Sequence, residues 1–138
     1  MILVDTSAWI EFDRATRSPV DRRLTELISR DGEVAVTEPV IAELAAGARC
    51  DQREAALRSL LARFQLLPFD SVADFDGAVS IYRRCRTAGI TPRGLLDCMI
   101  AAVALRYQTP VLAHDADLAR IAEVMPLQLD KASLRVDA

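Results

Sequence analysis

The chain has 138 residues, of which 51% are apolar, and a formal net charge of −3. This length and composition exclude a disordered chain and suit one globular domain over residues 1–138. The longest apolar stretch is too short to cross a bilayer, and the N-terminus lacks the basic segment of a signal peptide. Three cysteines without CxxC spacing predict neither a disulfide framework nor a zinc site, so we expect a cytoplasmic protein.

Short apolar runs alternate with helical patterns along the whole chain. In chain order the sequence predicts a strand at Met1–Val4, a helix from about Ala8, a helix at Pro19–Arg30, a strand at Glu33–Val36, helices at Glu38–Ala48 and Gln52–Phe64, a strand at Gln65–Pro68, helices at Ser71–Arg86 and Gly94–Tyr107, a strand at Pro110–Ala113, a helix at Ala116–Val124 and an edge strand at Leu127–Leu129. This alternation indicates an α/β sandwich around a mostly parallel sheet with right-handed crossovers.

Carboxylates stand at four places where a soluble chain usually has apolar side chains. They are Asp5 after Ile2–Val4, Glu43 within Val40–Ala46, Asp97 within Leu95–Ala102, and Asp115 after Val111–Ala113. Isolated carboxylates are rarely buried unless they are paired or bind a cation. If the fold gathers these four, their mutual repulsion calls for a divalent metal ion.

The predicted elements make this convergence reasonable. Asp5 and Asp115 follow predicted parallel strands, and open α/β sheets place their active sites at the carboxyl ends of their strands. Asp97 lies in the first turn of its helix, where the helix dipole favours an anion.

Each acid also has an ordinary interpretation. Asp5 can cap the following helix, Glu43 can lie on a solvent-facing side, and Asp115 and Asp117 can be turn or cap residues. Asp97 has apolar neighbours on both sides, so a solvent-facing position would expose little else. The four together are more informative than any one of them.

The motifs around these acids resemble PIN-domain ribonucleases, and specifically the VapC toxins of bacterial type II toxin–antitoxin pairs. The matching segments are Ile2–Trp9, Glu43–Gly47, Leu96–Ala102 and His114–Leu118, in the family's order and spacing. Leu118 stands where many members have Phe, which affects packing rather than chemistry.

The resemblance implies a PIN fold, an α/β/α sandwich with a five-stranded mostly parallel sheet. By motif position Asp5, Glu43, Asp97 and Asp115 are the catalytic acidic quartet, and Asp117 matches a further acid of many members. Thr6 and Ser7 match hydroxyl positions that support the site through hydrogen bonds. The resemblance also implies a homodimer, an antitoxin that assembles with it into a hetero-oligomer, and a tRNA or rRNA substrate.

The chemistry agrees with this resemblance. His114 is the one histidine, so a histidine acid–base pair is excluded. Mg²⁺ or Mn²⁺ prefers carboxylate oxygens and activates water for phosphodiester hydrolysis. We expect metal ligands at Asp5, Asp97 and Asp115, with Asp117 as a further one, and Glu43 to bind metal or orient the water. Arg93 is either an RNA-phosphate contact or an ordinary loop arginine.

Other classes fit less well. A receiver-type phosphoacceptor needs a lysine near its last strand, but Lys131 lies beyond that strand. A haloacid-dehalogenase-type phosphatase needs an acid where Ser7 stands, and a P-loop needs a Gly-Lys pair that the chain lacks. A catalytically idle PIN-like module that binds RNA or protein remains as an alternative, against which the intact quartet argues. The sequence therefore predicts an Mg²⁺- or Mn²⁺-dependent endoribonuclease.

Overall fold

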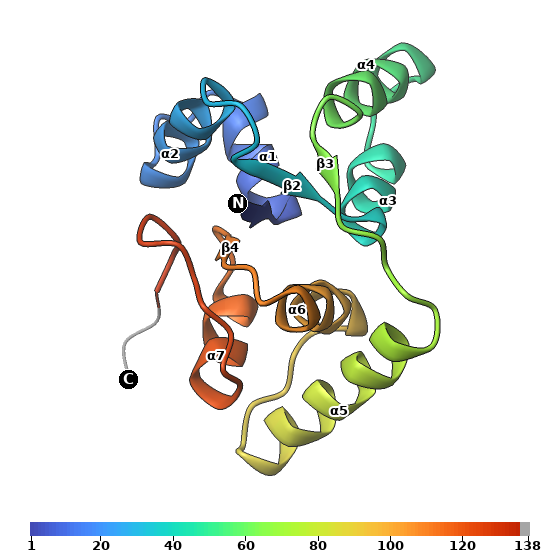
Figure 1. The fold of residues 1–138 in the computed structure, drawn as a ribbon, viewed down its shortest axis with the longest axis vertical. Coiled ribbons are helices and arrows are strands. Elements are labelled where there is room, and N and C mark those ends of the chain that lie inside the picture. The colour runs from blue at the N-terminus through green and yellow to red at the C-terminus, as the bar shows by residue number, and fades with distance from the viewer. Residues whose placement is uncertain (136–138) are drawn as a thin grey trace.

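The computed structural model describes residues 1–135, in which four short parallel strands form a sheet flanked by helices (Figure 1). The strands are β1 (Ile2–Val4), β2 (Val34–Val36), β3 (Gln65–Leu66) and β4 (Val111–Leu112). The helices are α1 (Thr6–Asp13), α2 (Pro19–Ile28), α3 (Glu38–Ala46), α4 (Asp51–Leu61), α5 (Ala73–Thr87), α6 (Leu95–Tyr107) and α7 (Ala116–Val124). The predicted α/β class with a parallel sheet is confirmed.

The sheet order β3-β2-β1-β4 places β1 between β2 and β4. Leu3 pairs with Ala35 of β2 and with Val111 of β4, so these three strands are in register. Their side chains are buried and apolar, as expected for parallel strands covered on both faces. Because all strands run in one direction, the residues that follow β1, β2 and β4 come out at one edge of the sheet.

The prediction of a fifth strand was wrong for the described residues. Leu129 makes a single parallel bridge to Val111, and no strand forms at Leu127–Leu129. The pairing ends because Asp130 turns the chain: its Oδ2 accepts a hydrogen bond from the Ala132 N–H at 3.0 Å. Arg23 of α2 holds the same carboxylate at 3.1 Å. The segment therefore forms one bridge to β4, and after the turn it stays beside β4 through hydrogen bonds of Ser133 and Leu134 rather than as a strand.

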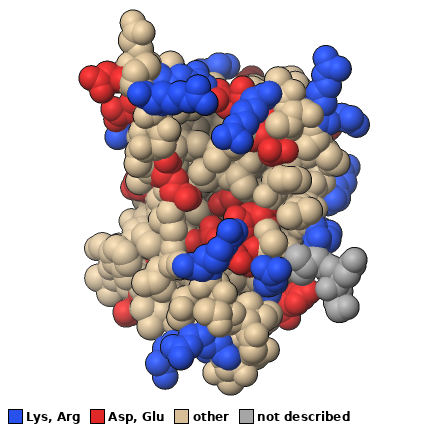
Figure 2. All heavy atoms as spheres, turned by 180° about the vertical axis from the view of Figure 1, so that it is seen from behind, with Lys and Arg blue, Asp and Glu red and all other residues tan. Residues whose placement is uncertain are grey.

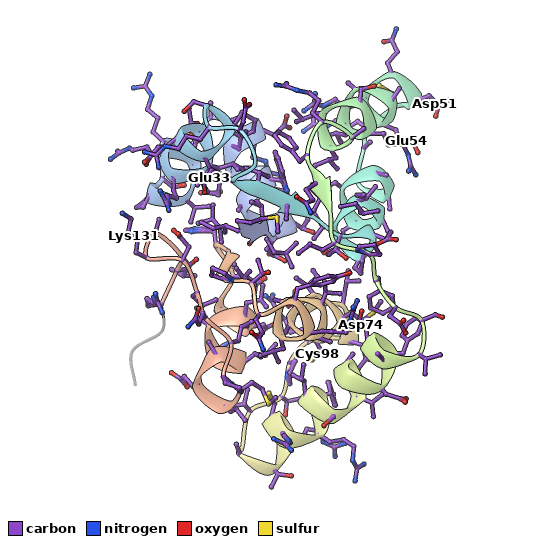
Figure 3. The ribbon with its side chains drawn as sticks, in the orientation of Figure 1. Glu33, Asp51, Glu54, Asp74, Cys98 and Lys131 are labelled. Carbon is purple, nitrogen blue, oxygen red and sulfur yellow. The ribbon has the colours of Figure 1, made fainter. Side chains whose placement is uncertain are left out.

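Helix α6 is the most deeply buried helix of the sandwich, with Cys98, Ile100, Ala101 and Val103 fully shielded from solvent. It packs along α5, and Asp74 of α5 lies at this contact (Figure 3). Arg106 of α6 donates to both oxygens of Asp74, from Nε at 2.9 Å and from Nη2 at 2.7 Å. This ion pair fixes the far end of α6 and so helps to fix the direction of its first turn.

Along residues 1–135 every helix falls short of the length and apolar character that a membrane crossing requires.

Candidate active site

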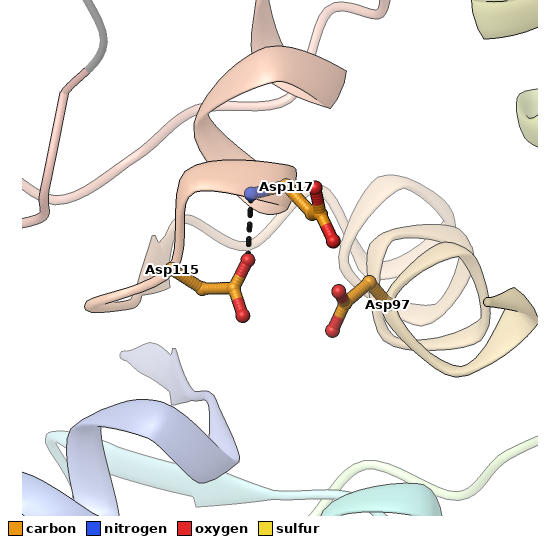
Figure 4. Close-up of side chains that lie close together, drawn as sticks. All are labelled: Asp97, Asp115 and Asp117. Carbon is orange, nitrogen blue, oxygen red and sulfur yellow. Dashed lines mark hydrogen bonds between the residues drawn. The ribbon is translucent and has the colours of Figure 1, made fainter. Parts of the chain in front are cut away.

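Three of the predicted site residues lie together at the carboxyl edge of the sheet. Asp97, Asp115 and Asp117 each offer a carboxylate oxygen, and these oxygens lie within 4.8 Å of one another. Figure 4 shows Asp97 reaching from the first turn of α6 toward Asp115 and Asp117 at the start of α7. The approach of α6 to α7 therefore brings together acids that are far apart in sequence.

Asp5 follows β1 directly and is 2% exposed. Its Oδ2 accepts hydrogen bonds from the Ser7 backbone N–H at 3.0 Å and the Ser7 hydroxyl at 2.6 Å. Its Oδ1 is buried and has no hydrogen-bond partner within residues 1–135. Burial raises the pKa of Asp5 to about 6, with the negative charges of Asp115 and Glu43 adding to it and the Ser7 hydrogen bonds opposing it.

Asp97 has the most perturbed carboxylate of the group. Burial raises its pKa to about 8, and the negative charges of Asp5, Asp115, Asp117 and Glu43 contribute to the increase. These contributions mean that all five predicted acids share one electrostatic environment. Without a cation, an ionised Asp97 is unfavourable there.

Glu43 lies at the margin of the group, half-buried on α3, a helix that contacts α1. Its Oε1 accepts a hydrogen bond from the Thr6 hydroxyl at 2.7 Å. The structure thus gives Thr6 a supporting contact to Glu43 and gives Ser7 a supporting contact to Asp5. Both hydroxyls lie where the sequence motif predicted hydrogen-bond support.

Asp115 caps α7, since its Oδ1 accepts from the backbone N–H groups of Asp117 at 2.6 Å and Leu118 at 3.2 Å. Its Oδ2 has no hydrogen bond within the described residues. Asp5 likewise caps α1 with one oxygen only. The capping interpretation and the site interpretation of these residues are therefore compatible, because each residue uses one oxygen for the helix.

Ser7 also connects the two strands that carry these caps. Its Oγ accepts a hydrogen bond from the His114 backbone N–H at 2.8 Å while donating to Asp5. The end of β1 is therefore linked to the loop between β4 and α7. This link fixes the spacing between Asp5 and Asp115.

Asp117 differs from the other acids because arginines contact it. Its Oδ2 accepts from Arg93 Nε at 2.9 Å, and its Oδ1 lies 3.3 Å from Arg120 Nη1. Burial raises the pKa of Asp117, but the Arg93 hydrogen bonds and the charges of Arg93 and Arg120 outweigh it, and the net pKa lies below the usual range. Arg120 was missed from the sequence, although its spacing of three residues from Asp117 on one helix was a usable signal.

A groove of about 490 Å³ opens beside the acids between α1, α3 and α4. Thr6 and Glu43 line it together with Arg14, Arg49 and Arg53. A larger hollow of about 970 Å³ lies along α5 and contains none of the predicted site residues. We assign the site to the acidic edge, because perturbed carboxylates and helix termini meet there and not along α5.

The donor set fits a hard divalent cation. The three groups whose oxygens lie within 4.8 Å of one another, on Asp97, Asp115 and Asp117, are all carboxylates, and such oxygens suit Mg²⁺ or Mn²⁺ better than softer metals. The buried Oδ1 of Asp5 has no donor within residues 1–135, and a cation would satisfy it. A cation would also relieve the repulsion that raises the pKa of Asp97.

Comparisons with known proteins agree with this geometry. The PIN domain pattern matches residues 2–124. The protein named ribonuclease VapC11 from Mycobacterium tuberculosis is 40% identical over 129 residues, which cover 93% of this chain and 96% of that protein.

Solved structures show the same fold at lower identity. VapBC2 from Rickettsia felis, solved with a promoter DNA fragment, superposes with a TM-score of 0.74 at 16% identity, covering 97% of this chain and 99% of that one. VapC20 from M. tuberculosis, described as a toxin that cleaves the sarcin–ricin loop, gives a TM-score of 0.68 at 18% identity, covering 93% and 99%. From its sequence pattern and its relatives, the chain belongs to the PIN-domain family and, within it, to the VapC toxins of toxin–antitoxin systems.

Proposed function

We propose that this protein is an Mg²⁺- or Mn²⁺-dependent endoribonuclease that hydrolyses phosphodiester bonds in RNA. One observation carries the proposal: the carboxylates of Asp97 on α6 and of Asp115 and Asp117 at the start of α7 meet at one edge of the sheet, and burial together with the charges of neighbouring acids raises the pKa of Asp97 to about 8. Gathering these carboxylates lowers the stability of the metal-free folded protein. A catalytic site that binds a cation is the physical reason that best explains why the cluster is there.

In this proposal Asp5, Asp97 and Asp115 hold the cation. A bound divalent ion supplies an activated water and stabilises the leaving oxyanion of a phosphodiester. Glu43, held by the Thr6 hydroxyl at 2.7 Å, orients the attacking water from the margin of the site. Ser7 holds the Asp5 carboxylate so that its unbonded Oδ1 stays directed away from the helix cap.

The substrate that we propose is a structured RNA, either tRNA or rRNA. Two facts about relatives support this: VapC11 is named a ribonuclease, and VapC20 is described as cleaving the sarcin–ricin loop. The proposed hydrolysis by an activated water leaves a 5′-phosphate and a 3′-hydroxyl. Products with 2′,3′-cyclic phosphates would contradict it.

We also propose that an antitoxin from the same system binds and inhibits the protein. Structural neighbours such as VapBC2 from Rickettsia felis and VapBC from Salmonella typhimurium were solved as toxin–antitoxin assemblies on DNA, which supports this partner. A homodimer that joins the antitoxin in a cytoplasmic hetero-oligomer follows from the family resemblance.

The test is cleavage of labelled total tRNA and of rRNA by the purified protein without antitoxin, with Mn²⁺, with Mg²⁺ or with EDTA. Asp5→Asn and Asp97→Asn are the site variants, and Asp51→Asn on the exposed start of α4 is the matched control. Discrete cuts that need metal and both site carboxylates, and that persist in the control, are the expected result. Cleavage that survives both site substitutions would mean that the site is elsewhere or the activity is a contaminant.

A further inference from the structure

Asp117 is the one acid of the group whose two oxygens both have cationic partners. Its side chain is 5% exposed, and Arg93 and Arg120 reach it from different sides. Arg93 contacts Oδ2 through Nε at 2.9 Å and through its backbone N–H at 3.5 Å, and Arg120 contacts Oδ1 at 3.3 Å. Each oxygen of Asp117 therefore already accepts a hydrogen bond from an arginine, which makes Asp117 a poorer metal ligand than the neighbouring acids.

Arg93 is fixed at one end and free at the other. Its side chain is 80% exposed although Nε is held by a buried carboxylate. Within residues 1–135 its two terminal nitrogens donate no hydrogen bond, so they remain directed to solvent. Arg93 precedes Gly94, the N-cap of α6, and therefore stands at the rim of the site just before Asp97.

The negative charge of the site opposes RNA binding, and Arg93 can reduce this repulsion. Asp5, Glu43, Asp97 and Asp115 repel an approaching phosphate, and one divalent cation does not neutralise four ionised carboxylates. Arg93 and Arg120 together exceed the charge of Asp117 by one positive unit. Figure 2 shows acidic side chains gathered in the middle of one face with basic side chains directly beside them. A phosphate can thus meet positive charge at the border of the acidic centre.

Tethering also makes Arg93 a better phosphate ligand than a mobile arginine. A guanidinium offers its donors in a rigid plane, and one edge of that plane can bind Asp117 while the other binds a phosphate oxygen. Since folding has already ordered the side chain, less conformational entropy is lost when RNA binds.

We propose that Asp117 is a positioning residue that holds Arg93 against an RNA phosphate next to the acidic centre, rather than a direct ligand of the metal. The proposal rests on the proposed ribonuclease function, because it assigns a substrate contact to that same site.

The experiment compares Arg93→Ala, Asp117→Ala, the double variant and Arg93→Lys with the wild-type protein. RNA affinity is measured by fluorescence anisotropy with labelled total tRNA in EDTA, where metal-dependent cleavage is absent. Mn²⁺ affinity is measured separately by calorimetry without RNA. Arg84→Ala on α5, an arginine outside the site, is the matched control, and Asp97→Ala is the reference for loss of a metal ligand.

We expect Arg93→Ala and Asp117→Ala each to weaken tRNA binding by about tenfold, the scale of one hydrogen bond to a charged group. The double variant is expected to be no weaker than either single variant, because both changes remove the same contact. Arg93→Lys, which cannot bind Asp117 and phosphate at once in the same way, is expected to behave like Arg93→Ala. Mn²⁺ affinity stays near wild type in all of them.

A loss of Mn²⁺ affinity in Asp117→Ala equal to that of Asp97→Ala would overturn the proposal, and so would wild-type tRNA binding by Arg93→Ala. Should Asp117→Ala unfold, the two Arg93 variants still decide, because Arg93 is an exposed side chain. Failure of the proposed function has a different signature, since the wild-type protein would then show neither Mn²⁺ binding nor metal-dependent cleavage.

Discussion

The carboxylates at the two ends of α6 have opposite surroundings. At its last turn Arg106 binds Asp74, which is 1% exposed, through two hydrogen bonds of 2.9 and 2.7 Å. At its first turn Asp97 lies among other carboxylates, and within the described residues no arginine or lysine contacts it. The last turn of α6 therefore supplies the cation for a buried acid of α5, while the acid in its own first turn has no such cation within residues 1–135.

This difference distinguishes a carboxylate that stabilises the fold from one that is available to bind a ligand. Asp74 also accepts from the Asp70 N–H at 2.7 Å, so its charge is fully engaged inside the fold. In the part of the chain that the structure describes, Asp97 and the Oδ1 of Asp5 have no such partner, although arginines pair with acids elsewhere in it. We infer that the first turn of α6 is left for a ligand, while the last turn holds α5 and α6 together.

Arg106→Ala tests the ion pair between the last turn of α6 and Asp74, and it has the largest expected effect. It leaves Asp74 buried without its cation and also removes the hydrogen bond to the Pro68 carbonyl. We expect the free energy of unfolding to fall by about 3 kcal/mol, at the low end for a broken buried pair because Arg106 is partly exposed. Urea unfolding followed by circular dichroism measures this. An unchanged midpoint would mean that the pair does not hold the helices.

Asp97→Asn tests the first turn of α6. It should impair RNA cleavage without lowering the stability of the fold. RNA cleavage is expected to fall by about 100-fold or more, the scale for loss of one key group in a catalytic electrostatic site. The metal-free variant at pH 7 should unfold at a higher urea concentration than wild type, because the raised pKa of Asp97, about 8 against an ordinary 3.8, costs wild type stability at this pH and asparagine does not titrate. A loss of stability as large as that of Arg106→Ala would contradict the comparison.

The pH dependence sharpens the same contrast. Asp5 and Asp97 have folded-state pKa values of about 6 and about 8, against an ordinary value of 3.8. Between the ordinary pKa and each folded-state pKa, the carboxyl group is ionised in the unfolded chain but protonated in the folded protein. The metal-free protein should therefore be stable at low pH and lose stability as the pH rises from about 4 to 8.

Mn²⁺ is expected to oppose this loss, because it binds the ionised carboxylates. A tenfold excess over its dissociation constant stabilises by about 1.4 kcal/mol. The gain in melting temperature should be larger at pH 8 than at pH 6 and should shrink in Asp97→Asn. Thermal melts with Mn²⁺ or EDTA at both pH values measure it, and an equal gain at both would refute the assignment.

Arg58→Ala is the surface counterpart of Arg106→Ala and has the smallest expected effect. Arg58 pairs with Glu54 at 2.9 Å on α4, with both side chains open to solvent. Such pairs contribute about 0.3–0.5 kcal/mol. The same urea experiment should give a shift near its resolution. A loss comparable with that of Arg106→Ala would show that burial is not what distinguishes the two pairs.

Much of the fold could be predicted from local patterns. Strand-length apolar runs gave β1, β2, β3 and β4, and helical periodicity gave the seven helices of the described region within a few residues of their ends. The edge strand at Leu127–Leu129 was predicted from the same kind of run. It failed because the turn at Asp130 and the long-range contact to Arg23 ended the pairing after one bridge.

The candidate site, too, was predicted only in part. The apolar surroundings of Asp5, Asp97 and Asp115 and their places after strands or in first helical turns predicted that they would gather, and the structure brings them together. Their roles as metal ligands stay a prediction. The pairing of Asp117 with Arg93 was not predicted, because the two residues lie on different segments and no local pattern reports such a contact.

The sheet order has a consequence for synthesis of the protein. The proposed site draws on residues 5, 43, 97 and 115, and β4 must pair beside β1 before Asp115 can reach Asp5. A ribosome adds roughly 5–20 residues per second, so for roughly one to four seconds the nascent chain carries three of these acids before Asp115 is made. If the protein cleaves RNA as proposed, this order keeps it inactive beside the ribosomal RNA that makes it until β4 and Asp115 have emerged.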